Sequence, residues 1–232
     1  MFSVVILEAL PALTQNEFDL LLPFVSTEKQ ARIKRFRFFS DAQNCLLGDI
    51  LARIEICSAT GLANNQLEFS SNEYGKPLLL NAPQIHFNIS HAGHYIACVL
   101  SDVPVGIDIE IMRPFDCKII ERFFASDESA YVMGGKQLQR FYEVWTKKES
   151  RIKWEGVGLN KSLPSFSVFD QGGAEDNPVY QNVFQNNEAI CHICSAKREH
   201  PEIKVIDTAV LSDMLRAYQS LQQRARAAHN NA

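Results

Sequence analysis

The chain has 232 residues, enough to bury a substantial core as one large domain or as two compact halves. Its 46% hydrophobic and 22% charged residues are typical of an ordinary globular protein and exclude a disordered or repetitive chain. The net charge of -4 argues against broad nucleic-acid binding, which needs an overall or regional excess of basic residues, so any anion site must be local.

The first part of the chain predicts one strand followed by helices. The opening "FSVVILE" has the composition of a strand. Thr14 and Glu17 have the spacing of a capping box, so a short helix is expected to begin there. Ser26 can cap a second helix, "TEKQARIKRF". A longer helix is predicted over residues 41–60, where leucine and isoleucine recur at helical spacing, and Gly61 is a natural stop.

Strand and helix signals then alternate again. Between residues 66 and 110, short β-type runs separated by turns predict a small, largely antiparallel sheet. After Pro114, helical spacing returns in "CKIIERFFAS" and over residues 137–154. Four further runs, "SFSVFD", "PVYQNVF", "EAICHICS" and "EIKVID", predict strands. A last amphipathic helix is expected to contain Leu211, Met214, Leu215, Tyr218 and Leu221.

The order of strand, helices and strands therefore occurs twice. We predict an α+β fold of two similar halves in contact, residues 1–104 and residues 105–232. No apolar run approaches the roughly 18 to 20 residues of a membrane span, and the amino terminus lacks the layout of a signal peptide. We therefore expect a cytoplasmic protein that does not bind membranes.

The six cysteines are scattered through apolar segments, which predicts reduced thiols without disulfides. Cys191 and Cys194 have a spacing that could suggest zinc. Zinc sites normally draw on a second ligand pair in loop-like surroundings, however, and "EAICHICS" has the pattern of a strand.

Asp108 and Glu110 lie two residues apart in "GIDIE", so both carboxylates project from the same face of the predicted strand. Two carboxylates there repel each other unless a cation joins them. Oxygen ligands of this kind suit magnesium, which binds through a few carboxylates together with substrate phosphate. The alternative is an edge strand with a solvated acidic face.

The segment "WTKKESRIK" places Trp145, Glu149 and Lys153 on one face of a helix, with Lys148 beside them. Taken alone, Glu149 and Lys153 could form only a surface ion pair. A cationic segment without acids precedes the long helix, and it is either a solvated helix face or a phosphate clamp. Its members are Lys29, Arg32, Lys34, Arg35 and Arg37.

Ser90 and His91 are adjacent on a predicted strand, so their side chains point to opposite sides and cannot form a nucleophile and base pair with each other. At the end of a strand both could donate hydrogen bonds to one anion, and Gly93 would let the backbone approach closely. Lys76, in the turn "NEYGKP", adds a further cation.

Taken together and in this order, "FNISHAG", "VGIDIE", "FFASDE" and "WTKKESRIKWEGVGL" resemble the surfactin-synthetase-type 4'-phosphopantetheinyl transferases. The patterns G-[IV]-D-[IV]-E and W-[ST]-x-K-E-[AS], at this separation, carry the resemblance. It covers roughly residues 24 to 164. It implies two pseudo-symmetric α+β halves with the active site, and coenzyme A, in the cleft between them.

The resemblance also implies a reaction. Such enzymes transfer the phosphopantetheine arm of coenzyme A to a serine of an apo carrier protein and release adenosine 3',5'-bisphosphate. By this resemblance Asp108, Glu110 and Glu149 would hold Mg²⁺ against the pyrophosphate of coenzyme A. Lys153 would counter charge on the transferred phosphate, and Glu149, or a water on the metal, would take the serine proton.

The same resemblance assigns binding residues for coenzyme A. Ser90 and His91 match contacts to the pyrophosphate, and we count His91 with Glu149 and Lys153 as catalytic. Lys76 matches a contact to adenine or phosphate. Two further residues, Lys29 and Arg32, match the grip on the 3'-phosphate. Cys45 stands where the family commonly has a hydroxyl, and because a thiol is a weaker donor, that contact is in doubt here.

The expected partner is an apo acyl, peptidyl or polyketide carrier protein, acted on by a monomer. Phe115, in a loop after the acidic strand, is our candidate for docking the carrier, whereas Phe123 and Phe124 are expected to pack in the core. Two alternatives remain open: a magnesium-dependent phosphohydrolase that uses water in place of serine, and an inert relative that binds a carrier without turnover.

Overall fold

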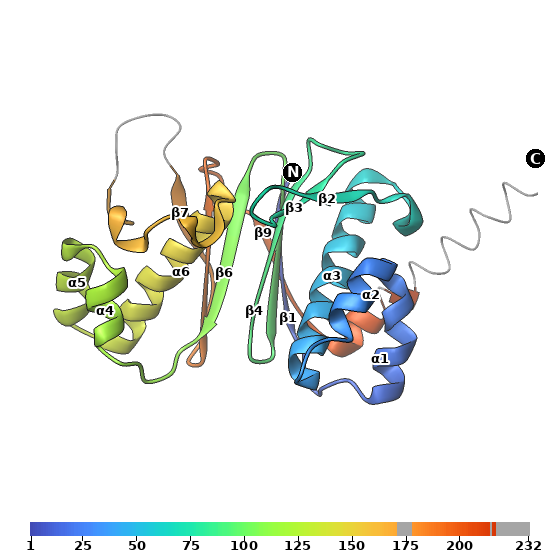
Figure 1. The fold of residues 1–232 in the computed structure, drawn as a ribbon, viewed down its shortest axis with the longest axis horizontal. Coiled ribbons are helices and arrows are strands. Elements are labelled where there is room, and N and C mark those ends of the chain that lie inside the picture. The colour runs from blue at the N-terminus through green and yellow to red at the C-terminus, as the bar shows by residue number, and fades with distance from the viewer. Residues whose placement is uncertain (171–177, 214, 217–232) are drawn as a thin grey trace, which may run out of the picture.

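The computed structural model describes residues 1–170, 178–213, 215 and 216. Two halves lie side by side, one with the helices of the first part of the chain and the other with α4, α5 and α6 (Figure 1). Central strands of both halves meet between the two groups of helices. The predicted α+β class is confirmed.

The first half contains a four-stranded sheet in the order β4-β5-β1-β9. Strand β1 (Phe2–Glu8) is antiparallel to β5 (Tyr95–Ser101), which in turn is antiparallel to β4 (His86–Ala92). The fourth strand, β9 (Glu202–Asp207), pairs with β1 in parallel. Because β9 follows the strands of the second half, the chain returns to the first half near its end. The division between residues 104 and 105 stays our proposal.

The capping box and the glycine stop predicted in the first half are both formed, but two helices differ from their predicted bounds: the second ends at Ile33 and the long one begins at Phe39. The capping box of Thr14 and Glu17 is formed: Glu17 N donates to Thr14 Oγ1 at 3.3 Å and Thr14 N to Glu17 Oε2 at 2.7 Å. Gly61 ends the long helix in the left-handed conformation, with φ of 72°. The helical segments are α1 (Gln15–Leu21), η1 (Leu22–Phe24), α2 (Thr27–Ile33), α3 (Phe39–Thr60) and η2 (Asn64–Gln66).

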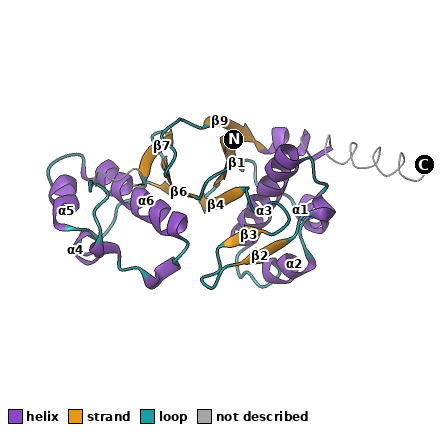
Figure 2. Cartoon of the chain, turned by 90° about the horizontal axis from the view of Figure 1, so that it is seen from above, coloured by secondary structure: helices purple, strands orange, loops and turns teal. Residues whose placement is uncertain are grey.

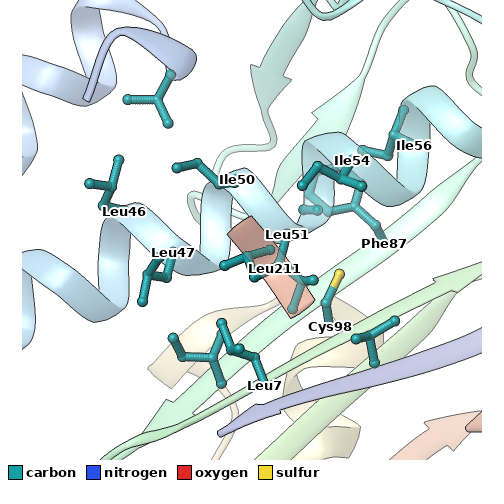
Figure 3. Packing of buried hydrophobic residues seen from close by; sticks show 14 of the residues in the cluster. Leu7, Leu46, Leu47, Ile50, Leu51, Ile54, Ile56, Phe87, Cys98 and Leu211 are labelled. Carbon is teal, nitrogen blue, oxygen red and sulfur yellow. The ribbon is translucent and has the colours of Figure 1, made fainter. Parts of the chain in front are cut away.

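Helix α3 packs on one face of this sheet and forms the first hydrophobic core (Figure 3). Its leucines and isoleucines meet Leu7, Phe87 and Cys98 of the strands. Residues 208–213, 215 and 216 are helical, and Leu211 and Leu215 are buried in the same core. The other members of the predicted last helix, Met214, Tyr218 and Leu221, lie outside the described residues.

The second half has a three-stranded antiparallel sheet in the order β6-β8-β7. Its strands are β6 (Val105–Ile111), β7 (Val179–Gln185) and β8 (Ala189–Ser195). Its helical segments are α4 (Lys118–Phe123), α5 (Ser126–Met133), α6 (Gln137–Glu155), η3 (Gly158–Asn160) and η4 (Leu163–Ser165). Helix α6 ends at Gly156, which again is left-handed, with φ of 70°.

The strand predicted from "SFSVFD" is wrong, because residues 165–170 contain the end of η4 and no strand. Side chains take the hydrogen bonds that a neighbouring strand would otherwise make. Lys148 Nζ donates to the oxygen of Phe166 at 2.6 Å, and Val168 N donates to Glu128 Oε1 at 2.8 Å. This segment therefore packs around a buried ion pair.

The two sheets share a second layer of buried residues, with valine, isoleucine and alanine from both. A short hairpin of the first half, β2 (Phe69–Ser71) and β3 (Pro77–Leu79), lies beside β4 (Figure 2). Cys45, Cys98, Cys117, Cys191 and Cys194 are free thiols. No helix in the described part of the chain is long and apolar enough to span a membrane.

Candidate active site

Strand β6 and helix α6 bring together the acidic residues of the two sequence motifs. Helix α6 lies beside β6 (Figure 1). The isoleucines of β6 are buried between the sheets, so Asp108 and Glu110, at alternate positions, face the opposite side, toward α6. Gly106 allows the helix to lie directly on the strand, because a Cβ there would be 2.0 Å from the backbone oxygen of Ser150. The close approach places the last turns of α6 beside the carboxylates.

Asp108, Lys153 and Ser90 form the centre of this site. Lys153 Nζ lies 2.7 Å from Asp108 Oδ1 and 2.8 Å from Ser90 Oγ, and the Ser90 hydroxyl donates to Asp108 Oδ1 at 3.0 Å. Asp108 comes from β6, Lys153 from α6 and Ser90 from β4. The centre therefore lies where the two halves meet.

Side chains of strand β4 also accept hydrogen bonds from the backbone N–H groups at the free edge of β6. Asn88 Oδ1 accepts a hydrogen bond from Ile107 N at 2.9 Å, and Ser90 Oγ accepts one from Ile109 N at 3.3 Å. Among the strands that the structure describes, none pairs with these backbone groups on that side. Asn88 and Ser90 thus replace a neighbouring strand and fix the two halves to each other.

Burial and mutual repulsion raise the pKa of the carboxylic acids. The pKa of Glu110 rises to about 7, first through desolvation and then through the charge of Asp108, while Lys153 and a hydrogen bond from Trp145 act in the opposite direction. Desolvation, followed by the charge of Asp108, also raises the pKa of Glu149. Burial is the main cause that raises the pKa of Asp108, against the effect of Lys153 and Ser90.

These acids suit a hard divalent cation. Asp108 Oδ2 is buried and has no hydrogen-bond partner among the residues described. The three carboxylates supply only oxygen, which is the ligand type that Mg²⁺ prefers. Within the described ranges no group of three His, Cys, Asp or Glu side chains is already arranged to hold a metal ion. In this structure Lys153 provides the positive charge next to Asp108.

A cavity of about 670 Å³ lies on the other side of β4. His91 points to it, so Ser90 and His91 face opposite sides of the strand, as predicted from their adjacent positions. The pKa of His91 is lowered, first by desolvation and then by the positive charge of Lys153. The polar residues that line the cavity include Lys29, Arg32, Arg35, Asn44, Cys45, Asp49, Arg53, Ser70 and Ser71.

Most of the predicted cationic segment borders this cavity. Lys29, Arg32 and Arg35 line it, and Lys29 Nζ lies 3.2 Å from Asp49 Oδ1. Arg53 Nε lies 2.6 Å from Asp49 Oδ2, and its guanidinium is 4.7 Å from the centre of the Phe69 ring. Asp49 therefore pairs with two cations along one wall of a cavity whose charged lining is four cations and the two acids Glu28 and Asp49.

Lys76 lies at the boundary between the halves. Its Nζ donates to the backbone oxygens of Val105 at 3.2 Å and Trp154 at 3.1 Å. Desolvation is the main cause that lowers the pKa of Lys76 to about 8. Gly75 and Pro77, on either side of it, line the cavity.

The sequence reasoning missed four residues of this region: Asn72, Asp49, Asn88 and Trp145 as a partner of Glu110. Asp49 could have been found from its spacing, since it lies four residues before Arg53 on a helix. Asn72 Nδ2 donates to the backbone oxygen of Gly156, and Asn88 Oδ1 accepts from Ile107 N. Both contacts join the two halves, and no local pattern in the sequence reveals them.

Comparison with known proteins agrees with this architecture. Residues 12–102 match the family model described as 4'-phosphopantetheinyl transferase, N-terminal. Residues 104–209 match the model of the 4'-phosphopantetheinyl transferase superfamily. Together the two models span both sides of the site described above.

Individual relatives are similar over most of the chain. The 4'-phosphopantetheinyl transferase Sfp of Bacillus subtilis is 36% identical over 202 residues, which are 82% of this chain and 90% of that protein. The transferase ffp of Bacillus subtilis is 43% identical over 159 residues, covering 67% of this chain and 71% of the relative. The transferase gsp of Aneurinibacillus migulanus is 36% identical over 76% of this chain and 79% of its own length. The resemblance inferred from the motifs is confirmed, and the chain belongs to the 4'-phosphopantetheinyl transferase family.

Proposed function

We propose that this enzyme transfers the 4'-phosphopantetheine arm of coenzyme A to a serine side chain of an apo acyl, peptidyl or polyketide carrier protein. Family membership supports the type of transfer. One observation supports coenzyme A as the substrate. The centre formed by Asp108, Lys153 and Ser90 lies at the boundary of the halves, beside a cavity with four cations in its lining. A nucleotide with several phosphates matches both features.

In the proposed reaction the serine oxygen attacks the phosphorus that carries the pantetheine arm. A bond forms between serine oxygen and phosphorus, and the bond from phosphorus to the oxygen bridging the two phosphates breaks. The leaving group is adenosine 3',5'-bisphosphate, and the serine proton passes to Glu149. Glu149 lies one helical turn before Lys153 on α6, and this position beside the centre supports the role.

The residues of the cavity and the centre then have separate tasks. Lys29 and Arg32 would bind the 3'-phosphate, and His91 would contact the pyrophosphate from the cavity side of β4. Lys153 would stabilise negative charge on the phosphate in transfer, since its ammonium already lies among anionic and polar groups. Asp108 orients Lys153 through their ion pair.

Asp108, Glu110 and Glu149 would hold Mg²⁺ when it is bound. The metal would supply Lewis-acid charge that polarises the phosphate oxygens. The buried Oδ2 of Asp108, which has no hydrogen-bond partner in the described part of the chain, supports this assignment. The mutual electrostatic destabilisation of the acids, which a cation relieves, supports it as well. We place the reaction in the cytoplasm and expect a monomer to suffice, because both sides of the site come from one chain.

One experiment tests the reaction against its alternatives. The protein is incubated with coenzyme A and Mg²⁺, with or without an apo carrier, and both adenosine 3',5'-bisphosphate and the mass of the carrier are measured. We expect bisphosphate only with the carrier, together with a carrier heavier by one phosphopantetheine group. Bisphosphate without any carrier would instead indicate a phosphohydrolase, and no product with any of a panel of carriers would indicate an inert relative.

A further inference from the structure

The turn between β2 and β3 belongs to the first half of the molecule, but two of its side chains contact the end of α6 in the second half. Lys76 donates to the backbone oxygens of Val105 and Trp154. Asn72 Nδ2 donates to the backbone oxygen of Gly156 at 2.8 Å. The last carbonyls of a helix have no partner within the helix, and a nearby cation interacts favourably with that end. The turn therefore caps α6 from the opposite half.

The turn is itself held by hydrogen bonds around Asn72. Asn72 Oδ1 accepts from Tyr74 N at 3.0 Å and from Lys76 N at 2.9 Å, and Asn72 N donates to the oxygen of Lys76 at 3.0 Å. At the helix end, a Cβ on Gly156 would lie 3.0 Å from Lys76 Cδ and 3.1 Å from Asn72 Nδ2. The two side chains thus fit closely against the helix terminus.

The same turn contacts both parts of the candidate active site. Gly75 and Pro77 line the cavity, whereas the Lys76 ammonium binds the helix residue next to Lys153. The lowered pKa of Lys76 agrees with an ammonium enclosed between the halves. A shift of this turn would consequently change the distance between a ligand in the cavity and the ammonium of Lys153.

We propose that Lys76 and Asn72 are positioning residues, which we call the α6 clamp, and that they act through the end of α6 without touching coenzyme A. This role differs from the contact to adenine or phosphate that the family resemblance implied for Lys76. The proposal rests on the proposed function, because its effect is on the placement of Lys153 during transfer. It predicts that loss of the clamp lowers kcat and leaves the affinity for coenzyme A unchanged.

The test uses Lys76→Met, Lys76→Arg and Asn72→Ser in the full chain. Methionine keeps the apolar stem and removes the charge. Serine keeps an acceptor for the turn but is too short to reach Gly156. Lys204, an exposed lysine on β9, provides the matched control Lys204→Met. For each protein, kcat is measured with saturating carrier and the Kd of coenzyme A by calorimetry.

We expect Lys76→Met to lower kcat about 10- to 100-fold, as misplaced catalytic groups do, with the Kd of coenzyme A changed less than about twofold. Asn72→Ser should lower kcat in the same way, and Lys76→Arg should restore most of the activity. A Kd weakened tenfold or more by Lys76→Met, with Asn72→Ser like the wild type, would show a direct substrate contact and overturn the proposal. Unchanged kcat in both variants would overturn it as well.

Hydrogen exchange separates this proposal from the proposed function. The amides of the last turn of α6 should exchange faster in Lys76→Met and Asn72→Ser than in Lys204→Met, with or without substrates. If the wild type transfers nothing to any carrier, the proposed function fails, while the exchange rates still decide whether the clamp exists. Equal exchange rates in all variants would count against the clamp itself.

Discussion

The ammonium group of Lys148 lies 2.7 Å from a carboxylate oxygen of Glu128, and neither side chain is exposed to solvent. Lys148 also donates to the oxygens of Leu163 and Phe166 at 3.0 and 2.6 Å. The pKa of Lys148 is lowered, mainly by burial, while Glu128 acts in the opposite direction. The pair joins α5, α6 and the segment after α6, and Lys148 immediately precedes Glu149 on α6.

Lys148→Met should destabilise the protein by about 3–5 kcal/mol, because it leaves the Glu128 carboxylate buried without its partner. The free energy of unfolding from urea titration measures this. The double variant Lys148→Met, Glu128→Leu should recover part of the loss, since no buried charge remains unpaired. A single variant less than about 1 kcal/mol below the wild type would contradict this account of the pair.

Asp108→Ala and Glu149→Ala should each abolish transfer and leave the fold intact. Each substitution removes a carboxylate from the proposed Mg²⁺ site without opening an apolar cavity. The transfer rate over a series of Mg²⁺ concentrations gives the result, with the thermal unfolding midpoint as a control for folding. Turnover like that of the wild type at ordinary Mg²⁺ concentrations would refute the metal assignment.

Lys29→Ala should raise the KM for coenzyme A more than the KM for 3'-dephospho-coenzyme A, because only coenzyme A carries the phosphate that this lysine would bind. Lys34→Ala, an exposed lysine in the same segment, is the matched control. Steady-state kinetics with both substrates and a fixed carrier concentration measure the difference. Equal losses on the two substrates would assign Lys29 a general electrostatic role.

His192 predicts a specific dependence of stability on pH. Burial is the main cause that lowers its pKa from 6.5 to about 3, and its Nδ1 lies 2.8 Å from Thr146 Oγ1. Below pH 6.5 the unfolded chain therefore binds a proton that the folded chain does not. The stability from this group is fully present above pH 6.5 and is lost as the pH falls toward 3.

The comparison of the wild type with His192→Asn isolates this effect, because other titrating groups act in both proteins. Urea unfolding at a series of pH values should show the wild type losing stability relative to the variant as the pH falls below 6.5. Parallel curves over that range would mean that the pKa of His192 is the same in the folded and unfolded chains.

Phe115 is less free than its loop position suggested, because its ring stacks on Phe141 with centroids 3.8 Å apart. Phe115→Ala should therefore lower the free energy of unfolding by about 1–3 kcal/mol. Phe115→Leu keeps most of the packing and serves as the control. Weaker carrier kinetics in the alanine variant, with unchanged affinity for coenzyme A, remains our prediction for docking. Unchanged carrier kinetics in both variants would count against this docking surface.

Local signals in the sequence predicted much of the fold because they act within one element. The caps of Thr14 and Gly61 set the ends of helices, and alternation along β6 set the face of Asp108. The segment after α6 was predicted wrongly because its apolar alternation matches a strand, whereas its backbone binds side chains of α5 and α6. That competition depends on tertiary contacts, which periodicity does not record.

In the candidate site too, local signals were predictable from the sequence and tertiary contacts were not. Motif spacing identified the acids and Lys153, since each motif lies within a single strand or helix. The ion pair of Lys153 with Asp108 spans residues 45 positions apart, and the Asn72 contact with Gly156 spans 84. Such pairings arise only when the two halves dock, so the sequence identified the acids and Lys153 but not the residues that pair with them across the boundary.

Gly106 is a position at which no other residue fits without moving α6. Any side chain there would push against the backbone of Ser150 and Trp154, which a Cβ would approach to 2.0 and 2.4 Å. It would act as a wedge that lifts the helix from the strand and stretches the ion pair between Asp108 and Lys153. The absence of a Cβ at position 106 thus sets how closely α6 lies on β6, and with it the distance between the Asp108 carboxylate and the Lys153 ammonium.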